Sequence, residues 1–426
     1  MFALYNPPIK QIKRWSRKMK VLTMKCMKCE KEYPEAADRY VCDDCGIDGI
    51  LDIVYDYSSI KISREEIAAS KNYSLWRYRK MLPVADTTDI PPLQVGWTPL
   101  YRARSVEKLL ELDNVYIKDD GRNPTASLKD RASAVGIAKA REAGAKTICA
   151  ASTGNAASSL AGFAASAGLK TVIFVPKRAP RAKVAQLLVY GAKTVIVDDT
   201  YDRAFELSVE ITKKFGLYNR NCAYNPFLVE GKKTVAYEMW EQMGFDLPDR
   251  VYVSIGDGCI TSGIYKGFYD LMQLGLTNRM PRIIGVQAAG CNPVEVALKT
   301  GEFVAQDGNT IADSIAVGIP RNRLKAMRAL KNSNGDCISV TDDEIRSALL
   351  EMPRATGVFG EPAGVTAFAG FKKHALAKDI GTTEKVVVLI TGNGLKDIES
   401  AISVCTMPAP VASDSATIEA HVKTLI

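Results

Sequence analysis

The feature that most constrains the fold of this chain is a regular alternation of short apolar segments with helix-like segments. The apolar segments are rich in β-branched residues and have the length of single strands: 114–120, 145–152, 170–176, 192–198, 249–256, 281–288 and 385–392. Segments between them, such as 129–143, 156–167 and 181–190, have the composition of helices. Buried strands separated by helices form parallel sheets that are covered on both faces. The sequence therefore predicts an α/β fold with two doubly wound, mostly parallel units, one embedded within the other.

The length and hydrophobic content of the chain are compatible with this fold class and do not narrow it further. The chain has 426 residues, of which 47% are hydrophobic, so it is long enough for two or three domains with a sizeable core. Its net charge is +8, and the basic residues concentrate only in the segment Lys10 to Lys20. That segment is either a basic face or loose tail, or a contact for nucleic acid or an anionic membrane. No apolar stretch follows it or approaches the ~18 residues of a membrane span, so neither export nor membrane insertion is expected.

Four of the ten cysteines occur as two close pairs near the N-terminus. Cys26 and Cys29 form one C-x-x-C motif, and Cys42 and Cys45 form the other. Two such motifs can place four thiolates tetrahedrally around zinc, and four sulfur ligands leave no open position for a substrate. The segment therefore predicts a zinc-ribbon-like unit with a structural zinc, and a hairpin with free thiols is the alternative. The acidic residues around the motifs argue against binding of nucleic acid.

The remaining cysteines are scattered singly, at Cys149, Cys222, Cys259, Cys291, Cys337 and Cys405. They share no spacing and lie in apolar or turn contexts, which indicates reduced core or loop residues and a cytoplasmic protein. The chain has only two histidines, His374 and His421. His374 lies in a helix-like Lys/Ala stretch and His421 in the last residues, so a mechanism centred on histidine is not expected.

Three loops at the ends of predicted strands have compositions suited to binding, and ligands of open α/β sheets bind outside the carboxyl ends of the strands. The loop ASTGNAASS (151–159) leads into a helix whose free N–H groups favour an anion such as a carboxylate. The loop SIGDGCITSGIYKGF (254–268) has the composition of a phosphate cradle. The loop ITGNGLKD (390–397) carries a threonine hydroxyl that could bond a ring nitrogen. Plain helix capping or tight glycine turns are the alternatives.

Lys129 lies in NPTASLKDRAS (123–133), where a proline turn meets a predicted helix. Taken alone, it has the character of a surface lysine. A lysine that forms a Schiff base with a phosphorylated aldehyde needs a phosphate cradle, donors for ring substituents and a seat for a carboxylate, and the three loops could supply them. Pyridoxal phosphate meets that description.

The motifs GWTPL, NPTASLKDRAS, STGNAASS, NPFLVEGKKTVAYE, GDGCITSGIYKGF, EPAG and TGNGLKD occur in an order that resembles the motif series of threonine synthases. These enzymes belong to the tryptophan-synthase-β-like, fold-type II class of pyridoxal-phosphate proteins, and some carry an N-terminal cysteine ribbon. The resemblance covers residues 26–397, nearly the whole chain. It implies a lyase of threonine biosynthesis that converts O-phospho-L-homoserine and water to L-threonine and phosphate.

The resemblance also implies a role for each motif residue. Lys129 would be the catalytic Schiff-base lysine, which moves protons at Cα, Cβ and Cγ of the substrate. Asn155 would bond the ring hydroxyl oxygen, and Thr391 would face the pyridine nitrogen. The cofactor phosphate would be held by Gly256, Asp257, Gly258, Cys259, Ile260 and Thr261. The substrate carboxylate would lie at Ser152, Thr153 and Ala156.

The chain then divides into predicted parts. These are a basic extension (1–24), a four-cysteine ribbon (25–57), a large cofactor-binding α/β domain (58–133 and 215–405), a small α/β domain (134–214) and a C-terminal tail (406–426). Dimers are common in this class. We therefore expect a homodimer that acts on a small amino-acid substrate and binds neither nucleic acid nor a membrane.

One departure from the family pattern bears on the substrate. Leu228 stands where the pattern has an arginine that helps to hold the substrate phosphate. A lysine replaces such a bidentate contact only partly. Three residues could supply the positive charge of the missing arginine: Lys232, Lys266 and Arg321. Of these, Lys232 is predicted to bind the substrate.

Two other functions stay open on the sequence alone. Without compensation for Leu228, the chain would be a serine/threonine ammonia-lyase or a related pyridoxal-phosphate enzyme acting on a non-phosphorylated amino acid. A non-catalytic binding or zinc-adapter protein with a decayed enzyme fold is the third hypothesis. The presence of Lys129, Asn155 and Thr391 argues against it.

Overall fold

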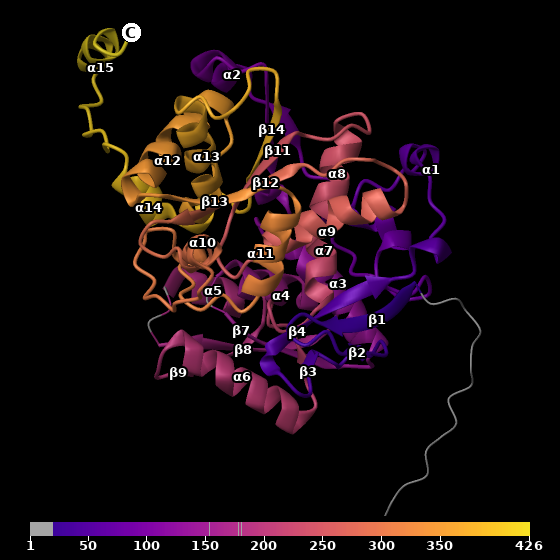
Figure 1. Cartoon of the computed structure of the whole chain (residues 1–426). Helices are drawn as coiled ribbons and strands as arrows, with labels where there is room; N and C mark the ends of the chain where they lie inside the picture. The colour runs from indigo at the N-terminus through magenta and orange to yellow at the C-terminus, as the bar shows by residue number, and fades with distance from the viewer. Residues whose placement is uncertain (1–19, 153, 178, 180) are drawn as a thin grey trace, which may run out of the picture.

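The computed structural model describes residues 20–426 except 153, 178 and 180. Three sheets with helices packed around them make up this part of the chain (Figure 1). The two sheets that follow the N-terminal segment are parallel over most of their strands. The structure thus confirms the mixed α/β fold that the alternation of segments predicts.

The largest sheet has six strands in the order β13-β12-β11-β14-β6-β5. In this order they are β13 (Asp336–Val340), β12 (Arg282–Ala288), β11 (Arg250–Ser254), β14 (Lys385–Ile390), β6 (Asn114–Asp119) and β5 (Leu100–Arg102). All neighbours pair in parallel except β5, which runs antiparallel to β6. The last strand in the sequence therefore lies in the middle of the sheet, between β11 and β6.

Helices cover both faces of this sheet. They are α2 (Arg104–Leu110), α7 (Phe227–Lys232), α8 (Thr234–Gln242), α9 (Cys259–Gln273), α10 (Pro293–Thr300), α11 (Arg323–Asn332), α12 (Asp342–Thr356) and α13 (Pro362–Leu376). Alternate residues of β14 enter two different cores. Val387 and Leu389 pack with α8 and α9, whereas Val386 and Val388 pack with α2, α12 and α13. Burial on both faces explains why these strands are continuously apolar.

The second sheet has four parallel strands in the order β10-β7-β8-β9. They are β10 (Tyr218–Asn219), β7 (Thr147–Ala151), β8 (Lys170–Pro176) and β9 (Lys193–Val197). Four helices accompany it, α3 (Lys129–Glu142), α4 (Asn155–Ser166), α5 (Arg181–Val189) and α6 (Tyr201–Phe215). The strand β10 lies beyond the predicted domain boundary at 214 and still pairs with β7. The domain limits as a whole stay predictions.

The N-terminal segment forms a small antiparallel sheet in the order β2-β1-β4-β3. Its strands are β1 (Val21–Cys26), β2 (Glu32–Tyr33), β3 (Val41–Cys42) and β4 (Gly46–Tyr55). Residues 21–24 therefore belong to this sheet and not to the predicted basic extension, whose residues 1–19 lie outside the described part.

Shorter elements complete the chain. The helices α1 (Arg64–Ala68) and η2 (Leu75–Met81) lead from the N-terminal sheet to β5, and α14 (Ile398–Ser403) and α15 (Ser415–Lys423) follow β14. In Figure 1, α15 lies apart from the rest of the molecule. Among the described residues, no helix combines the length and apolar character needed to cross a membrane.

Candidate active site

A cavity of about 340 Å³ lies where the loops of the two parallel sheets meet. Its walls come from the segments that follow β7, β11 and β14, together with the start of α3, as expected for a ligand site at the carboxyl ends of parallel strands. Most of the predicted site residues line it: Lys129, Ser152, Asn155, Ala156, Gly256, Asp257, Gly258, Cys259, Ile260 and Thr391. Thr153 lies outside the described residues, and Thr261 and Lys232 are buried behind the wall.

The loop that carries Lys129 is fixed to the loop that carries Thr391. The Leu128 N–H donates to the Thr391 carbonyl at 2.9 Å, and the Asn393 N–H donates to the Ala126 carbonyl at 3.0 Å. Ala126 has a φ of +64°, a left-handed conformation that turns the chain between Pro124 and the helix. These bonds hold the lysine and the threonine, 262 positions apart in the numbering (391 minus 129), on the same wall of the cavity.

Buried charges anchor the first turn of α3 behind Lys129. The Arg131 side chain is fully buried and binds Asp120 through two hydrogen bonds, Nε to Oδ2 at 2.6 Å and Nη2 to Oδ1 at 2.8 Å. Its Nη2 also donates to Glu238 at 2.7 Å, and Lys118 bonds the same carboxylate at 2.8 Å. Paired and hydrogen-bonded charges of this kind are tolerated in a core and restrict the position of the helix that carries them.

The environment of Lys129 favours its neutral amine. Burial lowers the pKa of Lys129, and the positive charges of Lys232 and Arg220 lower it further, whereas the Cys222 and Cys259 thiols oppose this change. A lysine with a lowered pKa has more of the unprotonated amine, which is the form that attacks a carbonyl. The residue is therefore suited to a covalent role.

Asn155, the first residue of α4, faces a carboxylate that sequence reasoning did not select. Its side-chain amide donates to Glu361, the residue that precedes α13, and the Glu361 N–H donates to the Gly392 carbonyl at 3.0 Å. Burial raises the pKa of Glu361. A Cβ atom on Gly392 would meet Glu361 Oε1, so a larger residue there would require the Glu361 carboxylate to move away from Asn155. Glu361 belongs to the EPAG motif, and this motif is the sequence feature from which its role could have been predicted.

The loop before α9 has the features of a phosphate site. Gly258 has a φ of +86° and directs the chain into α9, and no side chain caps the helix N-terminus. The first N–H groups of an uncapped helix need an acceptor, and a phosphate provides one. The buried Thr261 hydroxyl also has no hydrogen-bond partner among the described residues. The Asp257 carboxylate accepts from the Arg321 N–H at 3.2 Å, which closes the loop on its outer side.

A cluster of cations lies at the other side of Lys129. Arg220 lines the cavity with 1% of its surface exposed, and its Nη2 donates to Ser133 at 2.9 Å. Lys232 is fully buried, and its Nζ donates to the Cys222 sulfur at 3.1 Å. Sequence reasoning did not select Arg220 or Cys222, because neither belongs to a glycine-rich or lysine motif.

Leu228 does not face the cavity. It is fully buried in α7, and a Cβ atom on Gly136 of α3 would lie 2.7 Å from its Cδ2. Of the three residues proposed to compensate for it, Lys266 is engaged by Asp52 at 2.9 Å and Glu230 at 2.7 Å. Arg321 lines the cavity. Lys232 does not line it, but its Nζ bonds the sulfur of Cys222, which does.

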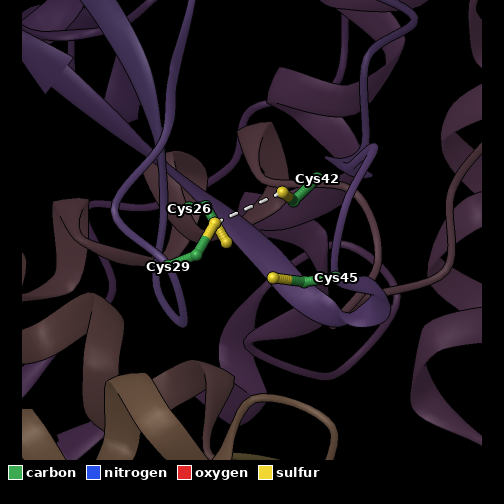
Figure 2. A group of neighbouring side chains, drawn as sticks. All are labelled: Cys26, Cys29, Cys42 and Cys45. Atoms are coloured by element: carbon green, nitrogen blue, oxygen red, sulfur yellow. Dashed lines mark hydrogen bonds between the residues drawn. The ribbon is translucent and has the colours of Figure 1, made fainter.

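The four N-terminal cysteines converge at a separate site. Figure 2 shows the sulfur atoms of Cys26, Cys29, Cys42 and Cys45 directed toward one another, and all four lie within 4.8 Å of each other. The set offers four sulfur ligands from two C-x-x-C turns, which is the donor set of a structural zinc site. The geometry therefore fits the predicted metal.

The N-terminal sheet contacts both halves of the molecule. On one side, Tyr55 donates to Glu230 of α7 at 2.6 Å, and Lys325 of α11 binds Asp52 at 2.9 Å. On the other side, the Tyr40 hydroxyl accepts from the backbone N–H of Asn219 in β10 at 3.0 Å. The sheet is thus packed against the helix that carries Lys232 and against the strand that precedes Arg220 and Cys222.

Comparison with known proteins identifies the family of this chain. The model of the pyridoxal-phosphate dependent enzyme family matches residues 92–392. A threonine synthase of Methanosarcina acetivorans is 38% identical over 91% of this chain and 95% of its own length. A threonine synthase of Methanocaldococcus jannaschii is 38% identical over 92% of this chain and 97% of its own length.

Solved structures show the same fold at lower identity. Threonine deaminase isoform 2 of Solanum lycopersicum has a TM-score of 0.63 at 23% identity, covering 72% of this chain and 86% of its own. Diaminopropionate ammonia lyase of Escherichia coli has a TM-score of 0.64 at 18% identity, covering 79% of this chain and 93% of its own. The fold is therefore that of fold-type II pyridoxal-phosphate enzymes. Together with the relatives that are 38% identical over nearly the whole sequence, these findings show that the chain belongs to the threonine synthase family of pyridoxal-phosphate-dependent enzymes.

Proposed function

We propose that this chain is a threonine synthase that converts O-phospho-L-homoserine and water to L-threonine and phosphate. The observation that carries the proposal is the arrangement of Lys129, Asn155, Thr391 and the uncapped start of α9 around one cavity, in a chain that is 38% identical to proteins named threonine synthase. When bound, pyridoxal phosphate supplies an aldehyde for amino groups and a ring that withdraws electrons from the substrate carbon atoms.

The residues of the cavity would hold this cofactor and move protons. Lys129 would be the attachment point of the cofactor, and its amine would transfer protons at Cα, Cβ and Cγ of the substrate. Thr391 would offer a neutral hydroxyl to the ring nitrogen, and Asn155 would bond the ring hydroxyl. The backbone from Gly256 to Thr261 would hold the cofactor phosphate at the start of α9, where the helix dipole favours an anion.

The substrate would lie between α4 and the cation cluster. Its carboxylate would bind at Ser152, Thr153 and Ala156, where the free N–H groups of α4 favour a negative charge. Its phosphate would bind on the side of Lys232 and Arg220, which supply positive charge beside the cavity. The Nε of Arg220, which has no hydrogen-bond partner within the described part of the chain, supports this assignment.

A substrate assay tests the reaction. We expect purified chain loaded with pyridoxal phosphate to release phosphate and threonine in equal amounts from O-phospho-L-homoserine. A serine/threonine ammonia-lyase would instead form a 2-oxoacid from threonine or serine, and the presence of Leu228 in place of the family arginine is the observation that favours this second function. Oxoacid formation without phosphate release would overturn the synthase assignment.

Replacement of Lys129 tests the assignment of the attachment point. Lys129→Ala should abolish the visible absorbance of the lysine-bound cofactor and lower kcat by on the order of a thousandfold or more, since the covalent and proton-transfer roles are lost together. Lys146→Ala is the matched control, because Lys146 is exposed in the loop before β7. Retention of the absorbance band in Lys129→Ala would contradict the assignment.

We also propose that Cys26, Cys29, Cys42 and Cys45 bind one structural zinc ion as a ribbon. The convergence of their sulfur atoms supports this proposal.

A homodimer and a cytoplasmic location stay predictions. Light scattering of the purified chain measures the first, and fractionation of cells that produce it measures the second.

A further inference from the structure

Two cysteines meet beside Lys129, although the sequence indicated scattered core or loop residues. Cys222 lies between β10 and α7, is partly exposed and lines the cavity. Cys259 is the first residue of α9, lines the same cavity and is 4% exposed. The two side chains pack in one small cluster with Ala223 and Val229. They are therefore neighbours across the start of the phosphate loop.

The Cys222 sulfur occupies a strongly cationic position. Lys232 Nζ donates to it at 3.1 Å and Arg220 Nη1 donates to it at 3.4 Å. Within the described residues, this sulfur is the only hydrogen-bond partner of the fully buried Lys232 ammonium. A buried ammonium requires an acceptor that offsets its desolvation, and a thiolate does this far better than a neutral thiol.

The electrostatics of the pair agree with this geometry. The neighbouring Cys259 thiol and the positive charges of Lys232, Arg220 and Lys129 lower the pKa of Cys222 well below its ordinary value, against the effect of burial. The neighbouring Cys222 sulfur, together with burial, raises the pKa of Cys259. One member of the pair is thus suited to attack as a thiolate, and the other is suited to remain protonated until it resolves a mixed disulfide.

We propose that Cys222 and Cys259 form a redox-modification site, at which a small-molecule disulfide oxidises the two thiols to an intramolecular disulfide. The Cys222 thiolate attacks one sulfur of the external disulfide, forms a mixed disulfide and releases one small thiolate. Cys259 then loses its proton to solvent and attacks Cys222 Sγ, which forms the Cys222–Cys259 bond and releases the second small thiol. Two protein thiols are oxidised, and one external disulfide is reduced to two thiols.

Formation of the Cys222–Cys259 disulfide would weaken binding of the cofactor. Cys259 carries one of the first N–H groups of α9, so its attachment to Cys222 changes the phosphate loop. It also removes the thiolate charge that faces Lys232 and Arg220. We expect oxidation to weaken binding of pyridoxal phosphate by about tenfold or more, and by reciprocity the bound cofactor should shift the equilibrium between the two thiols and the disulfide toward the thiols by the same factor. This inference does not depend on which amino acid is the substrate.

The test uses holoenzyme treated with oxidised glutathione, in buffer that contains zinc so that the ribbon stays loaded. Peptide mapping by mass spectrometry without reduction identifies the disulfide, and absorbance after gel filtration measures the cofactor that remains. We expect a Cys222–Cys259 cross-linked peptide, loss of cofactor and recovery of cofactor binding after dithiothreitol and fresh pyridoxal phosphate.

Each variant is compared with its own reduced form, so differences in starting cofactor content do not matter. Cys222→Ser and Cys259→Ser should show no loss of cofactor on oxidation, and Cys222→Ala repeats the first test if the serine variant folds poorly. Cys149→Ser is the matched control, because Cys149 is buried in the other sheet, and it should behave like the parent chain. Cys222 recovered only as a reduced thiol or only as a glutathione adduct, or cofactor loss unchanged in the variants, would overturn the proposal.

Discussion

Single residues in this chain acquire their roles from contacts that are remote in the sequence. Lys129, Asn155 and Thr391 could be selected from the sequence, because each follows or precedes a strand end in a motif of small and hydroxyl residues. Arg220 and Glu361 could not be selected in this way. Their roles depend on partners such as Ser133 and Asn155, 87 and 206 positions away, which only the folded chain brings into place.

The position of Leu228 leads to a prediction about stability. Leu228→Arg restores the family residue, but places a guanidinium against Gly136 at a fully buried position. We expect a loss of about 3 kcal/mol or more in the free energy of unfolding, since an unpaired buried charge is costly. Leu228→Met, which conserves volume, should cost less than about 1.5 kcal/mol. Urea unfolding measures both, and an arginine variant of native stability with a lower KM for O-phospho-L-homoserine would contradict this prediction.

The charge state of Cys222 leads to a prediction about pH. The groups that face its sulfur are Cys259, Lys232, Arg220 and Lys129, and the net effect is a lowered pKa. A lowered pKa keeps the thiolate at a pH where an ordinary thiol is protonated. Alkylation of Cys222 by iodoacetamide in cofactor-free protein should therefore change little between about pH 8 and pH 6.5, whereas alkylation of glutathione falls roughly tenfold per unit below its own pKa. A Cys222 rate that falls in parallel with that of glutathione would show that the thiolate is not stabilised.

Elements of secondary structure were predictable where hydrophobic periodicity is strong. The strands β6, β7, β8, β9, β11, β12 and β14 all lie within segments chosen from the sequence, since each contains several apolar, mostly β-branched residues in succession. All of them except β9 are largely buried. The strand β13 was not predicted, because DCISV is short, includes two polar residues and lies at the sheet edge. The strand β10 was missed because it has only two residues, Tyr218 and Asn219.

The N-terminal sheet leads to a prediction about metal removal. Its strands β2 and β3 have only two residues each, which is too short for independent stability. We expect one zinc per chain by elemental analysis, and a fall of a few degrees in Tm after chelation, because the sheet then holds Asp52 and Tyr55 less firmly against Lys325 and Glu230. Cys45→Ser should behave like the chelated protein, and Cys405→Ser, outside the sheet and exposed, should not. Equal Tm values with and without chelator would contradict a structural role for the metal.

At the scale of the whole molecule, two ion pairs connect the helices of the four-stranded sheet with loops beside the six-stranded sheet. Lys183 of α5 binds Asp313 at 2.5 Å, and Arg321 binds Asp202 of α6 at 2.8 Å. Asp313 and Arg321 line the cavity, so both pairs lie at its border. The sequence predicted two α/β units but could not predict how they face each other, since these pairs join residues more than 100 positions apart.

The C-terminal tail is expected to be dispensable for stability. Every residue from 406 to 426 is exposed, so its removal uncovers no core. A chain that ends at Cys405 should differ from the full chain by less than about 0.5 kcal/mol in the free energy of unfolding. A chain that ends at Glu384 is the contrasting variant, because it lacks β14 and should not fold. A marked loss of stability in the first variant would show that the tail has a partner on the molecule.

The central position of β14 has a consequence for how the chain folds during synthesis. The strands β5 and β6 leave the ribosome early, but they join β11 only through β14, which pairs with both β6 and β11. The large sheet therefore stays open until residues 385–390 have been made, and Thr391 reaches the Lys129 loop at that same moment. Contacts over such long sequence separations slow folding and leave apolar strands uncovered while they wait. The nascent chain should thus depend on chaperones until residues 385–391 emerge, and cofactor binding should follow their emergence.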